Sequence, residues 1–343
     1  MATVKDPSAA RQPVTLGMVA EAAGVSPATV SRILTGHARV SDDKRSAVEQ
    51  AIARLKYQPN ILAQGLARGR SLSVGVLTQD IKSPFYGEAL QGVEDVLSQA
   101  GVVPLFVSGH WNIKDEVDRM AHLLARRVDG VIVLTGRLTD AQLQEYAQTL
   151  PVVVTGRNLK GRNLVSMRVD DLAGARRATQ HLIELGHRRI AHIAGPQDHM
   201  DSVERVQGYR LALEAAGLPF EPRLIAYADF NESSGLLAIN QLLEARQSFS
   251  AVFAANDQMA YGARLALYQR NIRVPEDVSL IGFDDLPVSR FQIPPLSTIH
   301  QPVYELGQAA AEALLKLIDG GKSKTTLPEP QLVVRESTQR LRS

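Results

Sequence analysis

Polar and aromatic side chains recur in the last two thirds of the chain, mostly just after short β-branched runs. Carboxylates and amides exchange hydrogen bonds with hydroxyl groups, an arginine donates a planar fork, and an aromatic ring stacks on an apolar face. Together these side chains suit a polyhydroxylated small molecule. The selected candidates are Phe85, Tyr86, Trp111, Arg157, Asp201, Arg205, Phe230, Asn256, Asp284 and, further on, Gln301.

Each candidate taken alone has a structural alternative. A polar residue after a strand often caps the next helix, and Asp257, beside Asn256, could do only that. The shared position after strands is what favours a common ligand site over unrelated caps.

The elements that must position these residues follow an alternating pattern. Strand-like runs occupy 73–77, 102–107, 130–134, 151–155, 189–195, 251–255 and 278–283, and helical patterns occupy 86–100, 114–127, 171–185, 202–216, 233–246 and 257–270. This βα alternation predicts parallel sheets covered on both faces, and its length predicts two similar lobes. Ligands of such sheets bind at the carboxyl ends of the strands, where the candidates lie.

The first section of the chain has a different texture. Three short helical segments follow one another, the first beginning after Thr15, the second capped by Ser26 with Pro27 at its first position, and the third beginning after Ser41. Gly24 separates the first two with a tight turn. Two short helices joined by a turn and followed by a third are typical of a helix-turn-helix.

The second of these helices carries a face suited to DNA. Ala28, Thr29, Ser31, Arg32 and Thr35 are small or hydrogen-bonding, so the helix could enter a major groove and contact phosphates and base edges. The alternative is the solvated face of a small bundle. Residues 1–70 hold ten Lys/Arg against five Asp/Glu, while the whole chain is only +2, which favours a polyanionic partner for the front of the chain.

Composition excludes several classes of protein. The chain has 343 residues, 45% of them hydrophobic and 22% charged, which describes a globular protein of two or three domains. The absence of cysteine excludes disulfides, thiolate metal sites and a thiol nucleophile. The sequence shows no signal-peptide core and no apolar run long enough to span a membrane, so we expect a cytoplasmic protein with no membrane partner.

Enzyme signatures are also missing from the sequence. The phosphate-binding, dinucleotide-binding, serine-hydrolase and zinc-protease motifs do not occur, and no cofactor or metal site is expected. His187 and His192 are spaced badly for a shared metal on a helix, and His192 in a strand favours a structural role. Asp284 and Asp285 would point in opposite directions in an extended segment, which argues against an acid/base pair.

Several long motifs resemble the LacI/GalR family of transcriptional regulators, over nearly the whole chain. At the front these are VTLGMVAEAAGVSPATVSRILTG and YQPNILAQGLA; further on they are ELGHRRIAHIAGP, ERVQGYRLAL, FAANDQMAYGA, VPEDVSLIGFDD and PPLSTIHQP. The resemblance implies an α/β protein with an N-terminal all-α helix-turn-helix domain and a periplasmic-binding-protein-like, two-lobed effector domain with parallel sheets. It implies a regulator that binds an operator and a sugar, and not an enzyme.

The resemblance also implies roles for single residues. The DNA contacts would come from Thr15, Leu16, Pro27, Ala28, Thr29, Ser31, Arg32, Thr35, Arg39, Tyr57, Asn60, Ala63 and Leu66. Pro27 and Ala28 stand where the family reads bases, and Leu66 matches the leucine that enters the minor groove and bends the duplex. In the effector cleft Phe230 would be the stacking platform. Gly156 replaces a polar contact common in the family, for which Arg157 or Trp111 would substitute.

The resulting domain plan has four parts. Residues 1–12 form a tail, 13–57 the helix-turn-helix domain, 58–70 a hinge helix or linker, and 71–343 the effector domain. Within that domain one lobe takes about 71–171 and 302–328, and the other takes 172–301 and 329–343. Because no leucine heptads follow the last lobe, we expect a homodimeric repressor on a pseudo-palindromic operator rather than a tetramer.

Two rival classes remain open at this point. Residues 71–343 alone would also suit a pure sugar receptor, and the same fold could carry an enzyme. Salt dependence separates the DNA-binding regulator from the pure sugar receptor, because operator binding falls steeply with salt whereas sugar binding barely responds.

Overall fold

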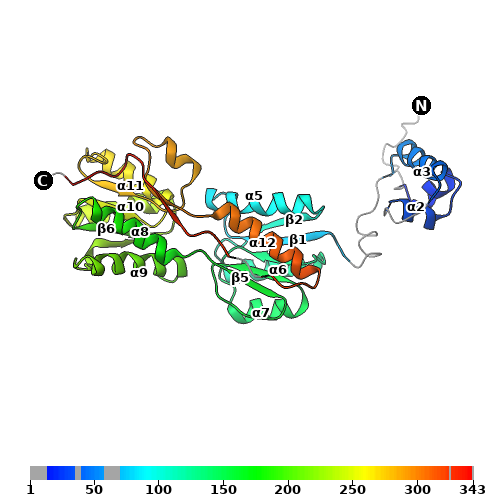
Figure 1. Cartoon of the computed structure of the whole chain (residues 1–343), viewed down its shortest axis with the longest axis horizontal. Helices are drawn as coiled ribbons and strands as arrows, with labels where there is room; N and C mark the ends of the chain where they lie inside the picture. The colour runs from blue at the N-terminus through cyan, green and yellow to red at the C-terminus, as the bar shows by residue number, and fades with distance from the viewer. Residues whose placement is uncertain (1–13, 35–39, 58–69, 324–325, 342–343) are drawn as a thin grey trace, which may run out of the picture. The chain divides into compact units, whose positions relative to one another are not determined.

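A computed structural model describes residues 14–34, 40–57, 70–323 and 326–341. The chain divides into two compact units, Met1–Ser71 and Leu72–Ser343, which are described separately. Figure 1 labels their elements along the chain.

The first unit contains the three expected helices, α1 (Leu16–Ala22), α2 (Pro27–Leu34) and α3 (Asp42–Leu55). The Oγ1 of Thr15 accepts a hydrogen bond from the Met18 amide, and the Oγ of Ser26 accepts one from the Thr29 amide, so both residues cap as expected. Gly24, at φ +65°, makes the turn between α1 and α2. Ser41 occupies the N-cap of α3 without a side-chain cap hydrogen bond.

Each helix of the first unit contributes to one small core. Val19, Val30 and Val48, one from each helix, are fully buried against one another. Because a core of this size buries little apolar surface, the turn and the caps matter for holding α2 in place.

The second unit contains two parallel sheets. The first lobe has strand order β2-β1-β3-β4-β5 and the second has β7-β6-β8-β9. The first-lobe elements are β1 (Ser73–Thr78), α5 (Pro84–Gln99), β2 (Val103–Ser108), α6 (Ile113–Ala125), β3 (Val131–Val133), α7 (Asp140–Thr149), β4 (Val152–Thr155), β5 (Leu164–Met167) and α12 (Val303–Ile318).

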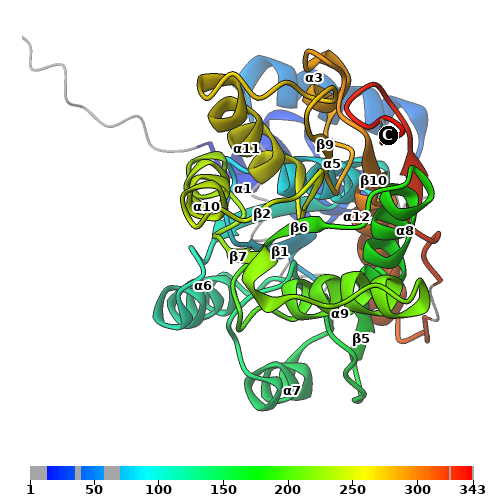
Figure 2. The ribbon, with the colours of Figure 1, turned by 90° about the vertical axis from the view of Figure 1, so that its left-hand side faces the viewer.

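The second lobe repeats the same architecture. Its elements are α8 (Asp171–Glu184), β6 (Ile190–Ala194), α9 (Met200–Ala215), η1 (Pro222–Leu224), β7 (Ile225–Tyr227), α10 (Glu232–Glu244), β8 (Ala251–Ala254), α11 (Asp257–Gln269), β9 (Ser279–Ile281) and η2 (Pro287–Phe291). A short antiparallel pair, β10 (Thr298–His300) and β11 (Gln331–Val333), completes it. Figure 2 shows α10 and α11 on one face of the sheet and α8 and α9 on the other.

Strand residues alternate between the two covered faces. In β6, Ile190 packs on the side of α8 and α9, whereas Ala191 and Ile193 pack on the side of α10 and α11. Because both faces are buried, the strands appear in the sequence as continuous apolar runs rather than as alternating ones.

The chain crosses between the lobes three times. It passes from β5 to α8, returns from β10 to α12, and crosses again from α12 to β11. Because three connecting segments join the lobes, a change in the angle between the lobes must bend all three segments. Among the described helices, none combines the length and apolar character that a membrane span requires.

Candidate ligand site and nucleic-acid surface

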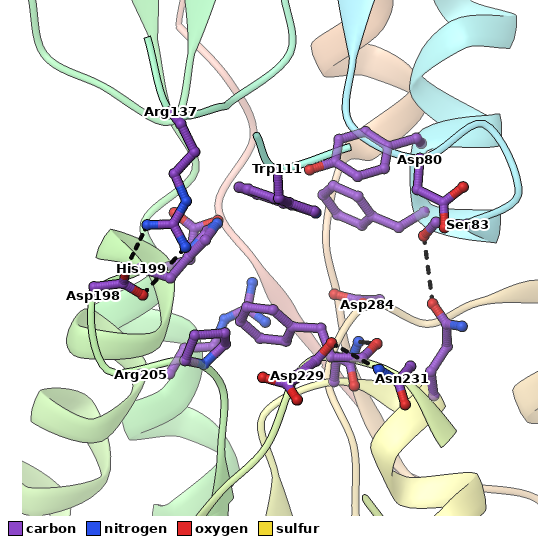
Figure 3. Close-up of a pocket in the computed structure, with 17 residues that line it drawn as sticks. Asp80, Ser83, Trp111, Arg137, Asp198, His199, Arg205, Asp229, Asn231 and Asp284 are labelled. Carbon is purple, nitrogen blue, oxygen red and sulfur yellow. Dashed lines mark hydrogen bonds and ion pairs between the residues drawn. The ribbon is translucent and has the colours of Figure 1, made fainter. Parts of the chain in front are cut away.

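A cavity of about 530 Å³ lies between the two lobes of the second unit. Figure 3 shows the side chains that project into it. The first lobe supplies Asp80, Ser83, Phe85, Tyr86, Trp111 and Arg137; the second supplies Pro196, Asp198, His199, Asp201, Arg205, Asp229, Phe230, Asn231, Asn256, Gln258 and Asp284. Nearly all follow the carboxyl ends of strands, as expected for parallel sheets.

The structure brings together all the predicted ligand residues except two. Phe85, Tyr86, Trp111, Asp201, Arg205, Phe230, Asn256 and Asp284 line the cavity. Arg157 and Gln301 do not, and each has another task.

Arg157 turns away from the cavity. Its guanidinium donates to the Asp140 carboxylate at 2.7 Å and to the Gly136 carbonyl at 2.7 Å, so it supports the loop after β3. The sequence contains the tripeptide Thr-Gly-Arg twice, after β3 and after β4, and the prediction chose the second copy. The arginine of the first copy, Arg137, is the one that lines the cavity.

Gln301 lies behind Asp284. Its Nε2 donates to Asp284 Oδ1 at 2.7 Å, and the side chain is 2% exposed. Gln301 therefore orients a cavity carboxyl instead of lining the cavity itself. It faces a small adjoining cavity of about 30 Å³ that also contains Gly156.

Arg205 places a buried positive charge in the cavity wall. Its Nε and Nη2 donate to Asp171 Oδ1 at 2.8 and 2.7 Å, Nη1 donates to the Ala255 carbonyl, and its guanidinium carbon lies 4.0 Å from the centre of the Phe283 ring. Burial raises the pKa of Asp171 to about 7, with Arg205 acting in the opposite direction. The pair is held on every side, which fixes the guanidinium for a ligand.

Carboxyl groups crowd the second-lobe wall. Burial raises the pKa of Asp284 well above its usual range, with Arg205 opposing the shift, and burial also raises the pKa of Asp201. Asp285 does not line the cavity and binds Arg335 at 2.6 Å, so the two adjacent carboxyl groups have different partners, on a left-handed backbone and not in an extended segment.

Aromatic rings from both lobes meet at one end of the cavity. The His199 ring lies edge-on between Trp111, at 4.8 Å between centroids, and Phe230, at 5.3 Å. Burial and the charge of Arg205 lower the pKa of His199 to about 4, so the imidazole is neutral at pH 7. Within the described part of the chain, its buried Nδ1 has no hydrogen-bond partner. Nothing in the residue pattern singles out His199 beyond its place after a strand.

Two polar contacts bridge the lobes across the cavity. Arg137 pairs with Asp198 through both guanidinium nitrogens, and Ser83 Oγ donates to Gln258 Oε1 at 3.4 Å (Figure 3). The Arg137 guanidinium also lies 5.9 Å from the Trp111 ring centroid. A ligand between these residues would contact both lobes at once.

Three cavity residues have left-handed backbone. Trp111, Phe230 and Asp284 have φ values of 55°, 58° and 120°. Such conformations are costly for residues other than glycine, and they persist where the surroundings impose them, often at binding sites.

The sequence left open whether Asn256 and Asp257 cap a helix or contact a ligand, and the structure gives the two residues different contacts. Asn256 caps α11, since its Oδ1 accepts from the Met259 amide, and its Nδ2 donates to the Phe230 carbonyl at 2.9 Å. Asp257 is not the cap; it is fully buried and accepts hydrogen bonds from Ser289 and Thr298. The described residues bring together no group of three His, Asp or Glu side chains that could hold a metal.

In the first unit, α2 presents an exposed face. Pro27, Ala28, Ser31 and Arg32 are exposed, while the Thr29 hydroxyl lies 2.9 Å from that of Ser26. Thr15 is exposed at the start of α1, and Leu16 packs against the core.

Tyr57, a predicted DNA contact, lies mostly inside the first unit. Only 9% of it is exposed, and its ring packs in the three-helix core. The predicted contacts at Thr35, Arg39, Asn60, Ala63 and Leu66, and the hinge at 58–69, lie outside the described residues.

Comparisons with known proteins agree with both units. Residues 15–60 match the family described as bacterial regulatory proteins, lacI family, and residues 179–338 match a periplasmic binding protein-like domain. The transcriptional regulator CelR of Thermobifida fusca is 39% identical, over 95% of this chain and 99% of that protein. The regulator GalR of Escherichia coli is 36% identical, over 98% and 96%.

Solved structures give the same result. A complex of CelR with cellobiose aligns at 39% identity with a TM-score of 0.70, over 94% of this chain and 99% of that one. The lac repressor dimer bound to operator and the anti-inducer ONPF aligns at 31% identity with a TM-score of 0.85, over 96% and 100%. The chain belongs to the lacI family of bacterial regulatory proteins.

Proposed function

We propose that this protein is a cytoplasmic, dimeric transcriptional repressor whose operator affinity is set by a sugar or sugar derivative bound between the two lobes. The observation that carries the proposal is the joint presence, in one chain, of a helix-turn-helix unit and a two-lobed unit with a polar, aromatic-lined cavity.

The DNA-binding part of the proposed function rests on α2. Its exposed residues Ala28 and Ser31 are small enough to approach a major groove, and Arg32 can reach phosphates or base edges. The basic front of the chain supplies the electrostatic attraction.

The sugar half rests on the chemistry of the cavity. Phe230 and Trp111 offer ring faces or edges to an apolar sugar face, and Asn231, Gln258 and Asp229 offer hydrogen-bonding groups to hydroxyls. Cellobiose in the CelR complex is the relative's ligand and the first sugar to try here.

Coupling between the halves requires a sugar that binds two lobe arrangements unequally. Contacts such as Arg137–Asp198 and Ser83–Gln258 exist only when the lobes are close, so a ligand that favours one separation shifts the balance. A coupling of about 3 kcal/mol would change operator affinity roughly 150-fold.

The dimer is supported by an exposed apolar patch on the second lobe, made of Leu265 and Tyr268 on α11 and Val288, Phe291 and Ile293 around η2. Tyr268, Phe291 and Ile293 are 78%, 76% and 83% exposed, which is costly in water for residues of this size. A second copy of the chain that covers the patch would remove this cost and pair two helix-turn-helix units on a pseudo-palindrome.

Fluorescence anisotropy with a labelled pseudo-palindromic DNA from upstream of the protein's own operon tests the proposal. The protein is titrated at near-physiological salt, alone and with mono- and disaccharides. We expect tight binding that one sugar reverses, and a steep loss of affinity with salt. Absence of binding to any such DNA would leave the pure sugar receptor as the better account.

A matched variant separates the two halves. Phe230→Ala removes the proposed stacking ring and leaves the first unit unchanged, so it should keep operator affinity and lose the response to sugar. A full sugar response in this variant would remove Phe230 from the ligand site.

A further inference from the structure

We propose that the cavity takes an uncharged, hydroxyl-rich saccharide and excludes the phosphorylated form of the same saccharide. This inference rests on the proposed function and narrows its ligand class. It is carried by the charges of the cavity wall and by the partners those charges already have.

Acidic side chains outnumber basic ones in the wall. Asp80, Asp198, Asp201, Asp229 and Asp284 line the cavity, whereas the positively charged side chains among the described lining residues are two arginines, since His199 is neutral at pH 7. No lysine is among the described lining residues. A site that binds a phosphate monoester needs positive charge to offset its charge of −1.5 to −2.

Both guanidinium groups already bind the carboxyl group of an aspartate. Arg137 forms a two-nitrogen pair with Asp198, and Arg205 is bound to Asp171 and to the Ala255 carbonyl. An incoming phosphate would have to compete with a carboxylate that is already in place, and in the case of Arg205 it would leave Asp171 buried without its cation.

The remaining carboxyl groups suit hydroxyls in either protonation state. Asp284 accepts a hydrogen bond from Gln301, and its burial raises its pKa, which favours a bound proton. A carboxylate accepts a hydrogen bond from a sugar hydroxyl, and a protonated carboxyl both accepts and donates. Neither form offsets a phosphate charge.

Helix N-termini are the other common means of binding phosphate, and here those of α10 and α11 are occupied. The side chains of Asn231 and Asn256 accept from the Ser234 and Met259 amides and so cap α10 and α11. The other two helices that reach the cavity have no side-chain cap, but α5 begins with a proline, which offers no N–H, and α9 carries the acidic Asp201 in its first turn.

The test compares neutral and phosphorylated members of the same saccharide. Trp111 is the only tryptophan of the chain and lines the cavity, so its fluorescence reports binding directly, with calorimetry as a second measurement. The probes are cellobiose and cellobiose 6′-phosphate, glucose and glucose 6-phosphate, and ribose and ribose 5-phosphate. We expect one neutral probe to bind and its phosphate to bind about 100-fold more weakly or worse.

A charge-reversal variant tests the cause. The hydrogen bonds at Asp229 are made by its backbone, so Asp229→Lys adds a cation to the cavity with little effect on the fold. This variant should narrow the ratio between the affinities for the neutral and the phosphorylated probe about tenfold. Glu145→Lys makes the same charge change at an exposed position on α7 and should leave the ratio as in the wild type.

The outcomes separate this inference from the function it rests on. A wild-type protein that binds a phosphorylated probe as tightly as its neutral partner, or an unchanged ratio in Asp229→Lys, overturns the inference and leaves a sugar-responsive regulator in place. A wild-type protein that gives neither a Trp111 signal nor heat with any probe contradicts the sugar half of the proposed function itself.

Discussion

At the scale of single residues, His199 has the position from which it can report on the cavity. Its ring touches Trp111 from the first lobe and Phe230 from the second, and its neutral state follows from burial near Arg205. An imidazolium in contact with an indole quenches its fluorescence, whereas a neutral imidazole does so weakly.

Acidification should therefore quench Trp111 with a midpoint near pH 4, the pKa to which burial lowers His199, and not near its ordinary 6.5. Steady-state fluorescence of the unliganded protein from pH 7 to about one unit below the expected midpoint measures this. His199→Phe keeps a ring beside Trp111 and should abolish the transition. A midpoint near 6.5, or an unchanged transition in the variant, would contradict the contact.

The burial of His192 predicts in which direction the free energy of unfolding changes with pH. It is fully buried in β6, stacked between Tyr209 and Phe253, with Nδ1 2.9 Å from the Phe253 carbonyl. Burial lowers its pKa to about 4 from 6.5, so between these values the unfolded chain binds a proton that the folded chain refuses. The contribution of His192 to stability is thus complete above pH 6.5 and is lost as the pH falls toward 4.

We expect the difference in free energy of unfolding between the wild type and His192→Asn to shrink by about 2 kcal/mol from pH 6.5 to 5. Asparagine can keep the donor to the Phe253 carbonyl but does not titrate. Urea unfolding of the second unit at several pH values measures the difference. If the difference in free energy of unfolding between the wild type and the variant stays constant over this interval, His192 is not held neutral.

Residue types and their place after strands sufficed to find eight of the seventeen cavity-lining residues, including Trp111, Arg205 and Asp284. The choice of Arg157 over Arg137 failed because both follow a strand in the same tripeptide, and only the Asp140 partner of Arg157 tells them apart. His199 was missed because its role depends on two rings that are distant in the sequence.

At the scale of elements, α5 and α12 show how closely the helices of the first lobe pack. A Cβ added at Gly307 would lie 2.0 Å from the Ala89 carbonyl oxygen, and one at Gly92 would lie 2.2 Å from that of Tyr304. The two backbones can approach this closely only because each helix has a glycine at the crossing.

Gly307→Ala should therefore destabilise the second unit by about 1–3 kcal/mol, because the two helices must separate. Gly87→Ala is its control on α5, where an added Cβ meets nothing within 4 Å; it should stabilise by about 0.5–1 kcal/mol. Chemical denaturation of both variants gives the comparison. Equal effects of the two substitutions would refute the close approach.

The exposed face of α2 predicts how substitutions affect operator affinity. If Arg32 contacts a phosphate, Arg32→Ala should lower operator affinity about tenfold across sequences and reduce the slope of log K against log salt by about 0.9. Arg210→Ala removes the same charge from an exposed site on α9 and should change neither quantity. An unaltered salt slope in Arg32→Ala would show that this side chain does not contact the backbone of the duplex.

The strands and helices with strong periodicity were predictable, with ends shifted by one to a few residues. Several elements were not among those predicted, including α7, β5, α12 and the β10–β11 pair. The helix α7 is polar on most of its surface and β5 is a short edge strand, so their patterns are weak, whereas the amphipathic pattern of α12 was missed. Packing on a sheet that already exists defines them.

At the scale of the whole molecule, the charge is divided unevenly along the chain. The front 70 residues are basic while the overall charge is only +2, and the cavity of the second unit is acidic. Polyanionic DNA and an uncharged sugar therefore suit different parts of the same chain.

The oligomeric state is testable through the apolar patch. Phe291→Asp should convert a dimer to a monomer in sedimentation experiments, since it places a charge at the centre of the proposed contact. Leu237→Asp changes another exposed apolar residue, on α10 and outside the patch, and should remain dimeric. A dimeric Phe291→Asp protein would move the interface elsewhere.

The central claim is that operator and sugar compete or cooperate through one chain. The most direct measurement titrates the effective neutral saccharide against the protein alone and against its operator complex, following Trp111 and DNA anisotropy in the same samples. Linkage predicts that the factor by which sugar changes operator affinity equals the factor by which operator changes sugar affinity, up to about 150-fold. Sugar binding that is identical with and without operator would contradict the account.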